Sequence, residues 1–118
     1  MSNIAIVVLT DTEGSEGLGR VVNALTAAKE FKEGGDHVKV AFTGAGTKWV
    51  GELTKPDHKL HSVFNELKDQ ITGACSFCAG AFGVYDSIQS AGVNLLEEYG
   101  TNMSFRQLIQ DGYHVLTF

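Results

Sequence analysis

Residues 3–10, NIAIVVLT, form an almost unbroken apolar run near the start of the chain. A strand with one face in water alternates apolar and polar side chains, whereas this run is apolar at every position from Ile4 to Leu9. Continuous runs of this kind, rich in β-branched residues, are typical of strands that are buried on both faces of a parallel sheet. We therefore expect the chain to open with a buried strand of a parallel sheet.

The rest of the chain alternates between helix and strand patterns. Apolar residues recur at helical spacing from Leu18 to Ala28, and Gly34 and Gly35 end that pattern. HVKVAFTG, residues 37–44, predicts a second strand, and its partial alternation favours a place near the sheet edge. Further helices are predicted over residues 60–67, from near Cys78 to Gly92, and over residues 104–112, the last capped by Ser104. Further strands are predicted over residues 70–75, 93–96 and 113–118.

This order of elements predicts the fold class. Strands that alternate with helices build βαβ units, and such units form a parallel sheet with helices on both faces. A length of 118 residues suits one domain. We predict a single α/β domain over residues 1–118, a flavodoxin-like three-layer α/β/α domain with a five-stranded, mainly parallel sheet. Ligands of such sheets bind beyond the carboxyl ends of the strands.

Three loops are expected at that edge: residues 11–18, 44–48 and 74–78. The first has the place of a phosphate-binding loop, but Asp11, Glu13 and Glu16 would repel a phosphate. GAGTKW, residues 44–49, suits an anion better, because it offers two glycines, a threonine and one positive charge where a helix starts. We predict that a small ligand at this edge meets Asp11, Gly44, Gly46, Thr47 and Lys48.

The charge and hydropathy of the chain exclude several partners. Nine basic and fourteen acidic side chains give a net charge of −5. Nucleic acids and anionic membranes both need a basic face, so neither is expected as a partner. The run from Ile4 to Leu9 is too short to cross a bilayer and lacks the basic flank of a signal peptide. We expect a cytoplasmic protein, in which paired cysteines are more often catalytic or metal-binding than disulfide-bonded.

The only two cysteines, Cys75 and Cys78, lie together in GACSFCAGAFG, residues 73–83. A thiolate is the reactive form of cysteine, and these apolar neighbours would disfavour it. The first turn of the following helix would favour a thiolate at Cys78, since its backbone N–H groups are unpaired. Cys78 is therefore the candidate nucleophile, and Cys75, at the end of a strand, is the neighbouring or resolving thiol.

Three other interpretations of the cysteines stay open. Both can be buried small hydrophobic residues that only pack. His58 and His61 of HKLH can complete a zinc site with the two cysteines. A thioredoxin-type dithiol is the third, although the only proline, Pro56, precedes the cysteines instead of following them.

Four segments resemble the small DsrE/DsrF-like proteins, a family associated with intracellular sulfur oxidation and sulfur relay. They are EGLGRVVNAL after the first strand, FTGAGTKWVGEL after the second, GACSFCAGAFGV, and the ending DGYHVLTF. The likeness covers nearly the whole chain, and the cysteine and GAGTKW segments are its most specific parts.

The resemblance implies a flavodoxin-like fold, no tightly held flavin or other cofactor, and assembly into small homo-oligomers. It also implies that Cys78 carries sulfur as a persulfide, taken from one sulfur protein and given to another. With Cys75 beside it, such a carrier needs no cofactor, because a second thiol can release the sulfur by forming a disulfide. A non-catalytic protein that binds a small ligand or supports assembly is the competing class.

Overall fold

The computed structural model describes residues 1–118 and places the opening apolar run inside a five-stranded sheet. Strand β1 (Asn3–Val8) pairs with β2 (His37–Phe42) on one side and with β5 (His114–Thr117) on the other. Beyond β2 follow β3 (Ile71–Cys75) and the short β4 (Leu95–Leu96). All pairs are parallel, and the strand order is β4-β3-β2-β1-β5. The predicted α/β class and five-stranded parallel sheet are confirmed.

The helices between the strands are shorter and more numerous than the sequence patterns predict. They are α1 (Gly14–Glu33), α2 (Trp49–Leu53), α3 (His61–Glu66), α4 (Ser76–Ala81), α5 (Tyr85–Ser90) and α6 (Phe105–Gln110), with 3₁₀ turns η1 (Gly44–Lys48) and η2 (Lys68–Gln70). The single helix predicted from near Cys78 to Gly92 is instead the pair α4 and α5, which Gly83 separates with a φ of +70°. Ser104 caps α6 as predicted, since its Oγ accepts the N–H of Gln107 at 3.0 Å.

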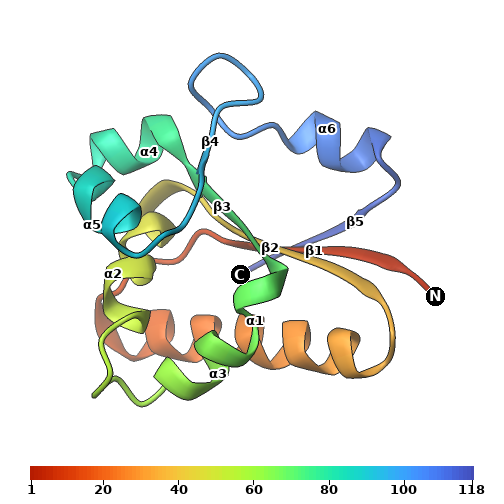
Figure 1. The fold of residues 1–118 in the computed structure, drawn as a ribbon, viewed down its shortest axis with the longest axis horizontal. Coiled ribbons are helices and arrows are strands. Elements are labelled where there is room, and N and C mark those ends of the chain that lie inside the picture. The colour runs from red at the N-terminus through yellow and green to blue at the C-terminus, as the bar shows by residue number, and fades with distance from the viewer.

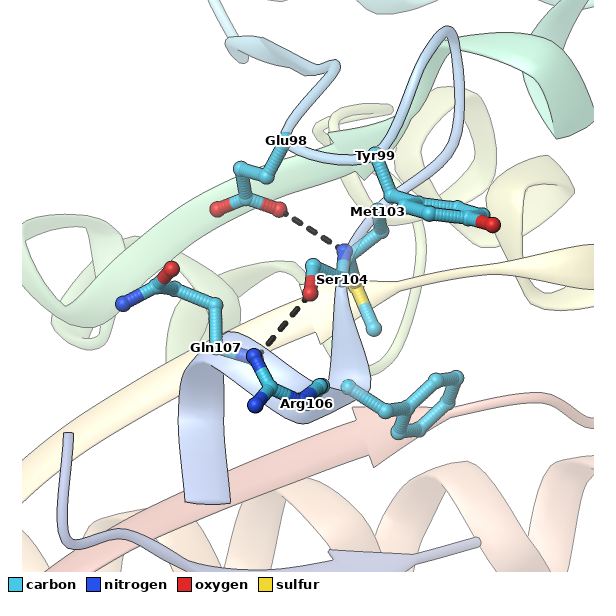
Figure 2. Close-up of a pocket in the computed structure, with 7 residues that line it drawn as sticks. Glu98, Tyr99, Met103, Ser104, Arg106 and Gln107 are labelled. Atoms are coloured by element: carbon cyan, nitrogen blue, oxygen red, sulfur yellow. Dashed lines mark hydrogen bonds between the residues drawn. The ribbon is translucent and has the colours of Figure 1, made fainter. Parts of the chain in front are cut away.

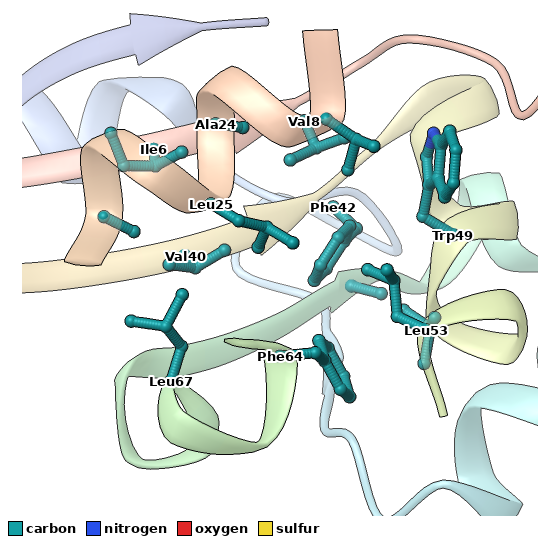
Figure 3. Packing of buried hydrophobic residues seen from close by; sticks show 14 of the residues in the cluster. Ile6, Val8, Ala24, Leu25, Val40, Phe42, Trp49, Leu53, Phe64 and Leu67 are labelled. Atoms are coloured by element: carbon teal, nitrogen blue, oxygen red, sulfur yellow. The ribbon is translucent and has the colours of Figure 1, made fainter. Parts of the chain in front are cut away.

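The strand order decides how the helices are shared between the two faces of the sheet. From β1 to β4 each new strand is added on the same side, and right-handed crossovers then put the intervening helices on one face. Only the return from β4 to β5 carries a helix, α6, to the other face (Figure 1). The main core lies under the first group, where α1 to α5 pack on the sheet around the fully buried Phe42 and Phe64 (Figure 3).

The face under α6 has a much smaller core. Six buried residues form it: Ala5, Val7, Ala41, Cys75, Met103 and Leu108. Lys39 lies on this face with its Nζ 4.7 Å from the centre of the Tyr113 ring. The partial alternation of residues 37–42 therefore reflects a sparsely covered face. The predicted edge position of this strand is wrong, because β2 lies between β1 and β3.

The helices also bear on the question of a membrane. The longest of them, α1, has 20 residues with polar side chains along its exposed side. No helix of this structure combines the length and the apolar character that a membrane crossing requires.

Candidate functional site

The two cysteines lie at the carboxyl edge of the sheet, as predicted. Cys75 is the last residue of β3, and Cys78 lies in the first turn of α4, which begins at Ser76. Both are free thiols. Because α4 has only six residues, its macrodipole is small, and individual hydrogen-bond donors matter more for the state of each sulfur.

A bulge in the sheet decides what Cys75 faces. Val40 pairs with Ile71, but the next pair is Ala41 with Gly73, so β3 contains one extra residue at this point. The pair after that joins Phe42 and Ala74. One step further in this register lie Thr43 and Cys75. Without the bulge, Thr43 would instead be opposite Ala74.

Cys75 is buried, with 1% of its surface exposed, yet its surroundings favour a thiolate. Its Sγ accepts the N–H of Met103 at 3.4 Å, and as a thiol it donates to Asn102 Oδ1 at 3.8 Å. Burial raises the pKa of Cys75, but the backbone N–H groups of Cys78 and Met103 and the side chains of Cys78 and Thr43 lower it, and the net pKa is below the ordinary value. The sequence alone does not show these neutral donors, which the fold brings to Cys75.

Cys78 is the more accessible sulfur. Cys78 is half-buried, whereas Cys75 is buried. Phe77, which precedes Cys78, is 57% exposed. Cys78 Sγ lies 3.6 Å from the Oγ1 of Thr43. A reagent that approaches the edge of the sheet therefore meets Cys78 before Cys75.

Thr43 is a site residue that the sequence patterns did not single out. It follows β2 directly, and its hydroxyl lies near Cys78 and also lowers the pKa of Cys75. The available signal was its position, since a polar residue after a buried strand of a parallel sheet lies at the ligand-binding edge.

The predicted ligand-binding residues divide into two groups. Lys48 Nζ lies 2.9 Å from Asp11 Oδ1, and this pairing holds the pKa of Asp11 below its usual value. Gly44, with a φ of +56°, starts η1. Gly46 and Thr47, however, are buried. In this structure neither residue lies exposed at the edge where a ligand is expected.

Packing explains why these two residues are not available. Gly46 lies so close to the backbone of Val8 that no side chain fits, and the Thr47 hydroxyl donates to Gly44 O at 2.8 Å. Lys48 also donates to the Asp11 carboxylate, so its charge is already paired. For these reasons η1 does not form an open binding site for an anion.

The zinc interpretation is also wrong, because its four residues do not form a ligand set. His61 Nδ1 lies 2.8 Å from Leu53 O, and His58 Nδ1 accepts the N–H of Leu60 at 3.0 Å. No group of three or more His, Cys, Asp or Glu side chains comes together in a way that holds a metal ion.

A groove of about 540 Å³ lies near the thiols, between α6 and the loop that precedes it (Figure 2). It is lined by Glu98, Tyr99, Met103, Ser104, Phe105, Arg106 and Gln107. The Glu98 carboxylate accepts the N–H of Ser104 at 3.0 Å and thereby ties the loop to the helix start. Met103 links the groove to the thiols, because its N–H reaches Cys75.

The fold and this edge together define an all-parallel α/β domain with a pair of reduced cysteines where such sheets bind their ligands. The family model of the DsrE/DsrF-like family matches residues 2–118, and the chain belongs to that family. Membership suggests sulfur relay as the general area of its function.

Two individual proteins are similar to this chain. An uncharacterized protein of Methanocaldococcus jannaschii is 29% identical over 96 residues, which are 81% of this chain and 78% of that protein. The structure of a conserved protein of unknown function from Bacteroides thetaiotaomicron superposes with a TM-score of 0.62 at 19% identity, over 97% of this chain and 94% of the other. The second likeness supports the fold alone.

Proposed function

We propose that this protein carries sulfane sulfur on Cys78 and that Cys75 is the resolving thiol. The observation that carries the proposal is the unequal pair at the sheet edge: Cys78 is accessible, whereas Cys75 is buried among donors that favour its thiolate. An accessible thiol suits exchange with another molecule. A buried thiolate suits attack on a neighbour within the same protein.

Loading is a sulfur exchange. The Cys78 thiolate attacks the outer sulfur of a persulfide or polysulfide donor, a new S–S bond forms at Cys78, and the donor leaves as a thiolate. The product is a persulfide on Cys78. No electrons are gained or lost overall, so this step needs no cofactor.

Release uses the second cysteine. The Cys75 thiolate attacks Cys78 Sγ, the bond to the outer sulfur breaks, and that sulfur leaves with the electron pair as hydrosulfide. The protein is left with a Cys75–Cys78 disulfide, which an external dithiol reduces before the next cycle. Alternatively, the thiolate of an acceptor protein attacks the outer sulfur and returns Cys78 directly to its reduced form.

The proposal includes the setting of this chemistry. We infer that the donor and the acceptor are other sulfur-handling proteins and that exchange takes place in the cytoplasm, where thiols stay reduced. We propose no nucleic-acid or membrane partner, because both would need a basic face and the net charge is −5.

We also propose that the protein is a homo-oligomer, as the family resemblance implies. The outer surface of α6 and of the loop before it supports this, because it exposes large apolar side chains: Tyr99 is 75% exposed, Phe105 43% and Ile109 59%. Apolar residues that gather on one face of a domain often mark a protein–protein contact.

The test compares wild type, Cys75→Ser and Cys78→Ser by intact mass after exposure to polysulfide and, separately, to an alkylating reagent. We expect Cys75→Ser to retain added sulfur, wild type to gain sulfur and then pass to the Cys75–Cys78 disulfide, and Cys78→Ser to gain little. Alkylation should modify Cys78 first, because Cys75 is buried.

Two results would contradict the proposal in different ways. If Cys78→Ser takes up sulfur and Cys75→Ser does not, Cys75 is the carrier and the roles are reversed. If native wild type takes up no sulfur and neither thiol reacts, the cysteines are structural, and the competing class, a non-catalytic ligand-binding or assembly protein, is correct.

A further inference from the structure

Thr43 is held in place at the thiol pair by its own backbone. Its N–H donates to Val8 O at 3.0 Å, and its carbonyl accepts the N–H of Gly46 at 2.9 Å. The residue is 6% exposed, so its hydroxyl has little access to water. Both the strand before it and the turn after it therefore fix where this hydroxyl lies.

The Thr43 hydroxyl does not cap the 3₁₀ turn that follows it. Thr43 is the N-cap residue of η1, and a threonine there usually accepts a backbone N–H of the first turn. No such capping bond forms in this structure. Instead Oγ1 lies 3.6 Å from Cys78 Sγ.

The bulge in β3 gives an independent reason to connect Thr43 with the cysteines. The extra residue between the Val40 and Ala41 pairs moves Cys75 into register with Thr43. Bulges are over-represented beside active sites, where they redirect a side chain. Here the Thr43 hydroxyl lies 3.6 Å from Cys78 Sγ and also lowers the pKa of Cys75, which ends the next strand.

We propose that Thr43 is a third catalytic residue of the thiol pair, whose hydroxyl donates to Cys78 Sγ or Cys75 Sγ, whichever carries the negative charge. A threonine hydroxyl has one proton to donate and turns about its Cβ–Oγ bond to face either partner. No covalent bond to Thr43 forms or breaks. The part of this inference that concerns sulfur transfer rests on the proposed function.

In the cycle, the charge is first on Cys78, as the attacking thiolate, and afterwards on Cys75, as the resolving thiolate. A donor that serves both positions favours each charged state in turn. The other groups that act on Cys75 are neutral: Asn102, the N–H of Met103, and the N–H and thiol of Cys78. At the same edge, the positive charge of Lys48 is paired with the carboxylate of Asp11.

The test isolates each thiol and removes only the hydroxyl. Thr43→Val keeps the shape of the side chain without the donor, and Thr43→Ser keeps the donor without the methyl group. Each is placed in Cys78→Ser, which leaves Cys75, and in Cys75→Ser, which leaves Cys78. The ionisation of the remaining cysteine is followed by NMR of its isotope-labelled Cβ across the pH range.

We expect Thr43→Val to raise the titration midpoint by about 1 pH unit in both backgrounds, because a hydrogen bond to a charged group is worth about a tenfold shift or more. Thr43→Ser should titrate like its parent. In the protein with both cysteines, sulfur uptake from polysulfide at a pH below the midpoint should fall about tenfold in Thr43→Val and recover in Thr43→Ser.

An unchanged midpoint for Thr43→Val in either background would overturn the inference that Thr43 serves both sulfurs, whatever happens to sulfur uptake. Thr43→Ala is a second variant, to be used if Thr43→Val does not give the native urea midpoint. If the midpoints shift but wild type takes up no sulfur, the proposed function fails while the assignment of Thr43 as a thiolate donor stands.

Discussion

Gly73 makes the bulge in β3 possible, and replacing it with alanine should damage both the fold and the thiol pair. A Cβ at this position would lie 2.5 Å from Asn94 O and 2.9 Å from the side chain of Leu96. The φ of Gly73 is +154°, a conformation that residues with a side chain rarely adopt. Asn94 O cannot easily move away, because it accepts the N–H of Ala74 at 2.8 Å.

The size of the effect follows from these two costs. Overpacking of a tight site costs about 1–3 kcal/mol, and a strained backbone conformation costs about 1–3 kcal/mol. Gly73→Ala should therefore lower the free energy of unfolding by about 2–6 kcal/mol, a large part of the roughly 5–15 kcal/mol typical of a domain.

Urea unfolding followed by circular dichroism measures this loss, with the denaturant dependence checked for a constant slope. Gly19→Ala is the matched control, because nothing lies within 4 Å of its Cβ position in the middle of α1. Alanine there should stabilise the protein by about 0.5–1 kcal/mol. A loss below about 1 kcal/mol in Gly73→Ala, or an equal loss in the control, would refute the reasoning.

Two more predictions concern the charged pair at the sheet edge and the exposed apolar surface of α6. The folded pKa of Asp11 is lowered, so its contribution to stability is complete above the ordinary aspartate pKa of about 4 and disappears as pH falls through the lowered value. The difference in urea midpoint between wild type and Asp11→Asn should accordingly be constant near neutral pH and vanish in acid; a difference that grows in acid would contradict this. Ile109→Glu on α6 should reduce the mass measured by light scattering to that of a monomer, whereas Val22→Glu, on the exposed side of α1, should leave it unchanged. A monomeric wild type would contradict the oligomer proposal directly.

The sequence predicts the architecture because the decisive signals are local. The apolar run at residues 3–10 identifies a strand buried on both faces, and the cap at Ser104 is read from residues three apart. The position of β2 is different. Its alternation depends on which helices cover the second face, and that follows from the crossover order of the whole chain.

The site was only partly predictable for the same reason. Strand ends and helix starts place Cys75 and Cys78 at the correct edge. The state of Cys75 depends on Met103, 28 residues later in the chain, and this long-range contact has no sequence signature. It also depends on a one-residue bulge, which Gly73 inside a strand pattern hints at without showing what the bulge brings together. The GAGTKW pattern suggested an anion cradle, but its composition does not show that Gly46 is pressed against the end of β1.

The late position of β5 has a consequence for dynamics. This strand joins the sheet only through β1, across almost the full length of the chain, and such distant pairings form late in folding. The segment that ends in β5 also carries Asn102, Met103 and Leu108, which contact or pack around Cys75. Regions with few buried contacts open more often than the core does. In Cys78→Ser, the alkylation rate of Cys75 should therefore report the rate at which residues 97–118 open. Hydrogen exchange of the β5 amides should give the same opening rate.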